Sequence, residues 1–150
     1  MPEAKIIKEP ISIDALVNSL KELDEEKRAG AVVVFVGVVK GVVDKEKVDY
    51  LEYEAYVEKA LEEMNRIARE LSSREGVIDV KIYHRIDKLK PGEDIVYIAV
   101  SGVNRETAFS TAWEAIDRVK HEVPIWKKEV KGGKGVWVLG EGHRVSEDKL

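Results

Sequence analysis

The spacing of hydrophobic positions along the chain predicts three helices. Residues 13–23 place apolar side chains on one helical face, and Ser12 is a suitable N-cap before them. A second helix is expected at residues 57–71 and a third at residues 105–120, which Asn104 would cap. We expect the third helix to bury one stripe, made of Ala108, Phe109, Ala112, Trp113, Ile116 and Val119.

Shorter runs of β-branched residues, or of alternating apolar and polar residues, predict strands between these helices. The run AVVVFVGVVKGVV at residues 31–43 is so continuously apolar that we expect a strand buried on both faces. Because strands and helices mix without strict β–α–β alternation, their order favours an α+β fold with a mixed or antiparallel sheet. The expected strands cover residues 4–8, 31–43, 48–56, 77–86, 95–100, 125–130 and 136–139.

Length and composition narrow the class of protein. The 150 residues suit a single domain over 1–150, with a core at about 30–138 and a polar C-terminal tail at 140–150. The net charge of -4 argues against a nucleic-acid binder, which needs a basic face. Because the chain has no cysteine and only scattered histidines, we expect no metal site, and we assign no cofactor. Without a membrane-spanning apolar run or a secretory signal, the chain is expected to be cytoplasmic.

The segment KHEVPIWKKE at residues 120–129 holds the strongest candidates for chemistry. Pro124 fixes its own φ and keeps Val123 out of the helical region, so the third helix must turn into an extended strand here. Lys120 precedes this hinge and Lys127 follows it, so both are held more firmly than ordinary surface lysines. On local grounds, Lys120 also fits a cation that only stabilises the helix C-terminus.

Other cationic positions are candidates for binding an anion. Lys127 and Lys128 should point to opposite faces of one strand, so one of them faces solvent. Lys40 lies inside the apolar run, where its ammonium must reach water, pair or bind a ligand. Asn104 and Arg105 open a helix, where free N–H groups and a guanidinium suit a phosphate or carboxylate. A simple cap beside a solvated arginine fits these two residues equally well.

Five segments, taken together in this order, resemble the catalytic (large) subunit of molybdopterin synthase. The resemblance extends over residues 30–138, and it implies an α/β hammerhead fold with additional β structure. The segments are GAVVVFVGVVKG at 30–41, LEYEAYVEKALEEM at 51–64, HRIDKLKPGEDIVYIAV at 84–100, NRETAF at 104–109 and VKHEVPIWKKE at 119–129.

The resemblance implies a sulfurtransferase of molybdenum cofactor biosynthesis. Members of that family take sulfur from the C-terminal Gly-Gly thiocarboxylate of a small ubiquitin-like subunit. They place it on cyclic pyranopterin monophosphate, which acquires the dithiolene of molybdopterin. The resemblance also implies a homodimer at the centre of a heterotetramer. The alternative function is a non-catalytic α+β module that binds a phosphorylated small ligand or a carrier-protein tail.

The resemblance also assigns roles to individual residues. The family's catalytic lysines match Lys120 and Lys127. This chain departs from the family pattern at Lys40, commonly arginine, at Asn104, commonly histidine, and at Asp87, often glycine. Lysine keeps the charge without the bidentate fork, asparagine cannot titrate, and we interpret Asp87 as a loop variation. Positions that match the family's substrate-binding residues are Val38, Val39, Lys40, Asn104, Arg105, Lys128 and Glu129.

Helix geometry limits how these residues can combine. Arg105 and Lys120 are 15 positions apart on one expected helix, hence about 22 Å apart at ~1.5 Å per residue. They cannot both touch one small pterin from the same chain unless the helix breaks. We therefore favour a composite site that takes Lys120 from one chain and Arg105 from its dimer mate. Arg144 in the polar tail is a further candidate for an anion contact across that interface.

Overall fold

The computed structural model describes residues 1–139 and 143–146, except for the side chains of residues 139, 143, 144 and 146. The mixture of helices and strands confirms the α+β class, and no helix in the described part of the chain is long and apolar enough to cross a membrane. The helices are α1 (Ile13–Leu23), α2 (Val57–Ser72) and α3 (Arg105–Glu122), and each begins at the residue that the sequence predicts. The strands are β1 (Glu3–Ile7), β2 (Ala31–Val38), β3 (Val42–Val43), β4 (Glu46–Lys47), β5 (Tyr50–Ala55), β6 (Val77–Arg85), β7 (Asp87–Leu89), β8 (Asp94–Gly102), β9 (Ile125–Lys131), β10 (Lys134–Leu139) and β11 (His143–Ser146).

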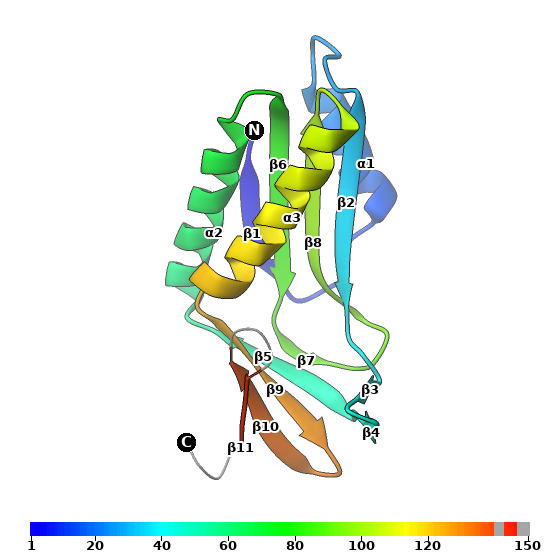
Figure 1. Cartoon of the computed structure of the whole chain (residues 1–150), viewed down its shortest axis with the longest axis vertical. Coiled ribbons are helices and arrows are strands. Elements are labelled where there is room, and N and C mark those ends of the chain that lie inside the picture. Colours follow the sequence, from blue (N-terminus) through cyan, green and yellow to red (C-terminus); the bar gives the residue numbers. More distant parts are fainter. Residues whose placement is uncertain (140–142, 147–150) are drawn as a thin grey trace.

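Helices cover both faces of a four-stranded sheet with the order β1-β6-β8-β2. Helices α2 and α3 lie on one face and α1 lies on the other (Figure 1). The alternation of side chains along β8 explains this arrangement. Val96, Ile98 and Val100 belong to the core beneath α2 and α3, whereas Tyr97 and Ala99 point into the core beneath α1. Because β1 pairs parallel with β6 and the other pairs are antiparallel, the sheet is mixed.

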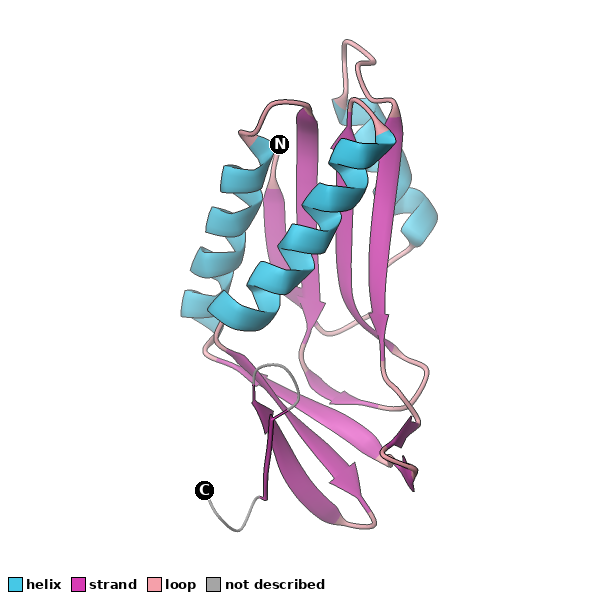
Figure 2. Cartoon of the chain, in the orientation of Figure 1, coloured by secondary structure: helices cyan, strands magenta, loops and turns pink. Residues whose placement is uncertain are grey.

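A second, antiparallel sheet with the order β11-β10-β9-β5-β7 lies beyond the C-terminal end of α3 (Figure 2). Strand β9 follows α3 directly, so the chain passes from the helix layer of the first sheet into the middle of the second. The inner face of this five-stranded sheet carries a small core made of Val39, Val48, Leu51, Tyr53 and Leu89.

Strand β2 is an edge strand, which corrects the expectation of a strand buried on both faces. It is the last strand in the sheet order, and Phe35 and Val38 are 36% and 49% exposed. The apolar run also breaks, because the register shifts between Gly37 and Val38 and β3 pairs separately with β4. A β-branched run specifies a strand, but the place of that strand in a sheet depends on partners elsewhere in the chain.

Helix α3 buries only part of the expected stripe. Ala108 and Ala112 are buried as predicted, whereas Phe109 is 63% and Trp113 is 77% exposed. The helix packs closely on the sheet, since a Cβ at Gly102 would lie 3.1 Å from the backbone nitrogen of Ala108. Small side chains fit this close approach, and the two aromatic rings lie on a flank that the described part of the chain leaves exposed.

The segment predicted as a polar tail contains a strand. His143–Ser146 form β11, which pairs antiparallel with β10. Residues 140–142 and 147–150 lie outside the described part of the chain.

Candidate functional site

The two predicted catalytic lysines lie on either side of the junction between α3 and β9. Helix α3 ends at Glu122, and Val123 follows in an extended conformation with φ of -93° and ψ of 130°. This is the turn that Pro124 predicts. Lys120 is exposed in the last turn of α3, and Lys127 is half-buried in β9. The C-terminal end of α3 therefore lies next to the five-stranded sheet, which the chain enters through β9 (Figure 1).

Strand register separates Lys127 from Lys128. Lys127 lies opposite Tyr53 of β5 and Val138 of β10, which are both buried, so it points to the inner face of the sheet. Lys128 lies opposite Trp137, and its Nζ is 5.6 Å from the centroid of that ring on the outer face. The predicted opposition of the two lysines is confirmed, and the register assigns Lys127 to the core side.

A buried histidine lies close enough to Lys127 to be affected by its charge. The ring of His84 in β6 meets the ring of Tyr53 edge-on, with centroids 5.2 Å apart and planes at 67°. Burial lowers the pKa of His84 to about 4, and the positive charge of Lys127 acts in the same direction. The imidazole is therefore neutral near pH 7. Its Nδ1 lies 2.6 Å from the carbonyl oxygen of Arg85, so Nδ1 carries the proton and donates it to that oxygen.

Glu129 is buried on the same inner face, opposite Leu51 of β5. Its Oε1 lies 3.4 Å from Nζ of Lys131, which also donates a hydrogen bond to the carbonyl oxygen of Val43 at 3.3 Å. Burial raises the pKa of Tyr53, and the charge of Glu129 raises it further. Glu129 is thus engaged with groups of its own chain, although the family's pattern places it among the substrate-binding residues.

Lys40 lies in an exposed loop, which corrects the expectation that it sits inside a buried strand. Strand β2 ends at Val38, two residues before it, and the side chain of Val38 is also exposed. Val39 is buried, and its N–H donates to the carbonyl oxygen of Glu93 at 3.0 Å. Because Val39 belongs to the same small core as Tyr53, the loop that carries Lys40 starts at the inner face of the five-stranded sheet.

Asn104 and Arg105 lie at the opposite end of α3. The Oδ1 of Asn104 accepts a hydrogen bond from the N–H of Thr107 at 2.8 Å, which is the predicted cap. Arg105 is exposed as the first residue of the helix. Because α3 is unbroken from Arg105 to Glu122, Arg105 and Lys120 lie about 22 Å apart at ~1.5 Å per residue. One chain therefore does not bring these two residues to the same small ligand.

The backbone of Arg144 pairs with Val138 in the ladder between β10 and β11. Its side chain lies outside the described part of the chain. The anion contact expected for Arg144 therefore stays a prediction.

The sequence did not place three residues beside Lys127 and Glu129: Tyr53, His84 and Lys131. The alternating segment LEYEAY predicted the strand that carries Tyr53, but alternation does not say which face is inside. A histidine within an alternating strand was the available signal for His84, since it shares a face with apolar neighbours. Lys131 follows the recognised motif and carried no local signal.

Asp87 has a backbone conformation that the interpretation as a loop variation did not anticipate. Its φ is +76°, in the left-handed region where glycine is favoured. Its carboxylate Oδ2 lies 3.4 Å from Nζ of Lys8. The glycine that the resemblance leads one to expect at this position would meet the same backbone requirement.

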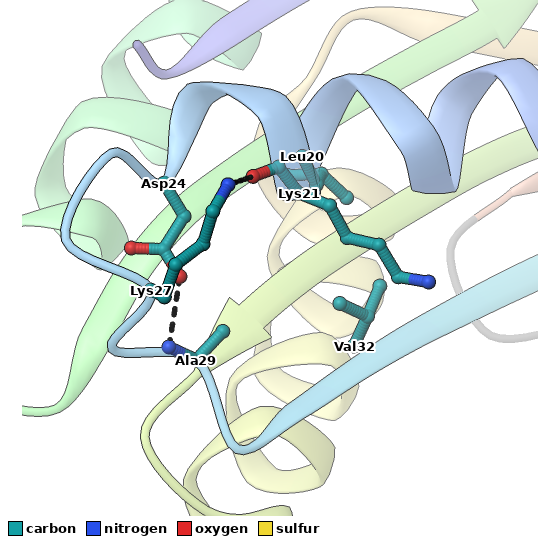
Figure 3. A pocket seen from close by; sticks show the side chains of 6 residues that line it. All are labelled: Leu20, Lys21, Asp24, Lys27, Ala29 and Val32. Atoms are coloured by element: carbon teal, nitrogen blue, oxygen red, sulfur yellow. Dashed lines mark hydrogen bonds between the residues drawn. The ribbon is translucent and has the colours of Figure 1, made fainter.

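A surface hollow of about 270 Å³ lies beneath the loop between α1 and β2, and no predicted candidate lines it. Its polar groups close the loop (Figure 3): Asp24 accepts from the N–H of Ala29 at 2.9 Å, and Lys27 donates to the carbonyl of Lys21 at 3.0 Å. Among the described residues no group of three or more histidine, aspartate or glutamate side chains could hold a metal ion. The lining residues of the hollow are Leu20, Lys21, Asp24, Lys27, Ala29 and Val32.

Cations therefore border the five-stranded sheet on several sides. Lys127 faces the inner side of the sheet, Lys120 stands at the end of α3, and Lys40 lies in the loop after β2. Ammonium groups can stabilise phosphate, carboxylate or thiocarboxylate anions and a developing oxyanion. This end of the molecule is the candidate site.

Comparisons with known proteins show which family the chain is similar to. The family described as MoaE protein matches residues 6–122. The molybdopterin synthase catalytic subunit of Pyrococcus abyssi is 40% identical over 114 residues, which cover 76% of this chain and 77% of that protein. The corresponding subunit of Staphylococcus carnosus is 35% identical over 144 residues, which cover 96% and 91%. The crystal structure of molybdopterin synthase from Staphylococcus aureus has a TM-score of 0.78 and 37% identity, and covers 92% of this chain and 96% of that one.

Proposed function

The chain belongs to the MoaE protein family, and from that premise we propose that it is the catalytic subunit of a cytoplasmic molybdopterin synthase. It transfers sulfur from the C-terminal Gly-Gly thiocarboxylate of a small ubiquitin-like subunit to cyclic pyranopterin monophosphate. Two copies form the centre of a heterotetramer. The observation that carries the proposal is the pair of lysines at the junction of α3 and β9, one exposed and one half-buried beside a buried phenol.

The reaction needs cations more than it needs a strong nucleophile from this chain. The thiocarboxylate sulfur attacks an electrophilic carbon of the pterin side chain, and an oxygen substituent of that carbon leaves after it takes up a proton. Water then cleaves the acyl–sulfur bond of the resulting thioester, which leaves the sulfur on the pterin and returns the carrier as a carboxylate. Lys120 and Lys127 stabilise the thiocarboxylate and the developing oxyanions. Lys40 and the Arg105 end of α3 hold the substrate phosphate, with Lys128, Glu129, Asn104, Val38 and Val39 completing the binding region.

We extend the proposal to a composite site between two copies. Arg105, Phe109, Trp113 and Lys120 follow one another on one flank of α3, at spacings of one or two helical turns. The two aromatic side chains between the cations are exposed. A second copy packed antiparallel on this flank covers both rings and brings its own Arg105 toward the first copy's Lys120. The exposed rings between the two cations are the observation that supports assigning each site to two chains.

Reconstitution tests the catalytic assignment. The chain is incubated with a thiocarboxylated partner and cyclic pyranopterin monophosphate, and the dithiolene product is quantified. Lys120→Ala and Lys127→Ala, made singly, should each nearly abolish turnover while leaving the circular dichroism spectrum unchanged. The matched controls are Lys21→Ala, in the last turn of α1, and Lys134→Ala in β10, both at exposed lysines. Near-normal product formation by both lysine variants would contradict the catalytic assignment. If the wild-type protein binds the pterin but forms no product, the result would favour a non-catalytic binding module.

Mixing two inactive variants tests the composite site. Arg105→Ala and Lys120→Ala chains, each inactive alone, should regain activity when mixed, because a heterodimer contains one intact site. Differently tagged chains allow the heterodimer to be purified and counted. Absence of recovery in purified heterodimers would contradict a site shared between copies.

A further inference from the structure

Lys131, at the end of β9, connects the strand that carries Lys127 to the loop that carries Lys40. Its side chain is only 15% exposed, although it lies next to the turn at Gly132. Its Nζ lies 3.4 Å from Oε1 of Glu129 and donates to the carbonyl oxygen of Val43 at 3.3 Å. One ammonium group therefore joins β9 to β3.

The loop after Val39 is an extended excursion from the body of the chain. After leaving the core it forms the short hairpin β3–β4, whose turn residues Asp44 and Lys45 have φ of 52° and 66°. Val39 holds the beginning of the excursion, and the N–H of Val48 closes it on the carbonyl oxygen of Gly41 at 2.9 Å. The hydrogen bond from Lys131 holds its middle part, close to Lys40, against β9.

The burial of Glu129 explains why the Lys131 ammonium is held in one place. The Glu129 side chain is 3% exposed, and a carboxylate so far from water needs a compensating cation and hydrogen bonds. Lys131 supplies that cation from the same face of the same strand, two residues away. With one side of the ammonium directed at Glu129, another N–H is available to the carbonyl of Val43.

We propose that Lys131 is a positioning residue of the substrate site, which uses its ion pair with Glu129 to hold the Lys40 loop against the strand of Lys127. This inference rests on the proposed function of Lys40 in binding the substrate phosphate. In this arrangement Glu129 contributes to substrate binding indirectly, because it holds the ammonium group of Lys131 in place. Loss of the link loosens the phosphate contact in the ground state and leaves the lysines at the reacting centre in place. Loss of this link should therefore raise KM and leave kcat nearly unchanged.

Steady-state kinetics of the assembled enzyme test this division. Lys131→Met keeps the apolar stem and should raise KM for the pyranopterin about fivefold to tenfold with kcat within about twofold, the size expected for one lost hydrogen bond. Lys131→Arg should restore most of the loss. Lys134→Met is the matched control, because Lys134 is exposed and is the cross-strand partner of Lys131. Equal KM values for the Lys131→Met and Lys134→Met proteins would overturn the inference.

A double-mutant cycle with Lys40 tests the route of the effect. If Lys131 acts through the Lys40 loop, Lys131→Met should change KM less than about twofold when Lys40 is already alanine. A full effect in the Lys40→Ala background would contradict that route. The double variant Glu129→Gln/Lys131→Met removes the buried carboxylate charge together with the ammonium, so a rise in KM that persists in it comes from the lost link and not from a strained core. A KM restored to the wild-type value in that variant would count against the link.

Hydrogen exchange separates this inference from the proposed function. Amides of residues 41–47 should exchange about tenfold faster in the Lys131→Met protein than in the Lys134→Met protein, because the hairpin opens more often. Unchanged exchange rates would overturn the positioning role even in an active enzyme. If the wild type makes no dithiolene, the proposed function fails, and the exchange experiment still decides whether Lys131 holds the loop.

Discussion

At the scale of single residues, His84 links protonation to the stability of the fold. The imidazole is buried against Tyr53, next to the charge of Lys127, and its pKa falls to about 4 from an ordinary value near 6.5. Between these two pH values the unfolded chain binds a proton that the folded chain does not bind. The free energy of unfolding must therefore decrease as the pH falls from about 6.5 towards 4.

Replacement of His84 should flatten this pH dependence. Between pH 7 and pH 5 the wild type should lose roughly 2 kcal/mol more unfolding free energy than the His84→Gln protein, at about 1.4 kcal/mol per pH unit. Urea unfolding at both pH values measures the difference. Lys134→Met, at an exposed position of β10, is the control and should retain the wild-type loss. An equal loss in the His84→Gln protein and the wild type would show that His84 is not the titrating group.

At the scale of elements, Asn104 caps the N-terminus of α3 and also belongs to the proposed binding region. The carboxamide oxygen of Asn104 caps the helix through Thr107, as the hydroxyl of Ser12 caps α1 through Ala15. The two tasks are separable, because serine also caps a helix well.

Substitutions at Asn104 should separate capping from binding. Asn104→Ala should lower the unfolding free energy by about 1 kcal/mol, whereas Asn104→Ser should stay within a few tenths of the wild type, as expected for N-caps. If the amide also contacts the substrate, Asn104→Ser should raise KM at unchanged stability. Thermal unfolding and kinetics of the same preparations measure both effects. Ser12→Ala is the control, and it should lose a similar amount of unfolding free energy without any change in KM. A wild-type KM in the Asn104→Ser protein would mean that Asn104 only caps the helix.

At the scale of the whole molecule, an aromatic surface lies between α3 and the open edge of the four-stranded sheet. It consists of Phe109 and Trp113 on α3 and Phe35 on β2, all exposed. Phe35 lies opposite Ile98, which belongs to the core beneath α3, so its ring is on the same side of the sheet as the helix. Several exposed apolar rings on one side of a molecule are typical of an interaction surface.

Polar substitutions on this surface should separate the copies. The double variant Phe109→Ser/Trp113→Ser should remain folded, since neither side chain is buried in one chain, but should shift from dimer to monomer and lose most of its activity. Light scattering after gel filtration measures the mass. Leu23→Ser, at an exposed leucine at the end of α1 on the other side of the sheet, is the control. A double variant that stays dimeric would refute this surface as the interface.

The local elements of this protein were readable in its sequence. Helix starts at Ile13, Val57 and Arg105 follow from periodic apolar positions, two of them preceded by capping residues, and Pro124 forces the turn between α3 and β9. These signals act within a few residues of backbone, so no knowledge of distant partners is needed. The same holds for the opposition of Lys127 and Lys128, which any strand imposes.

The assignment of faces and neighbours was decided only by the tertiary structure. Alternation left open which of Lys127 and Lys128 points inward, and the pairing with Tyr53 and Trp137 resolves it. The apolar run of β2 forms an edge strand because it pairs with β8 on one side and stands last in the order of the described sheet. The contacts of Lys131 likewise join segments distant in sequence. Sequence by itself determined what each segment forms, since that depends on local backbone preferences, whereas burial and proximity depend on pairings between remote segments.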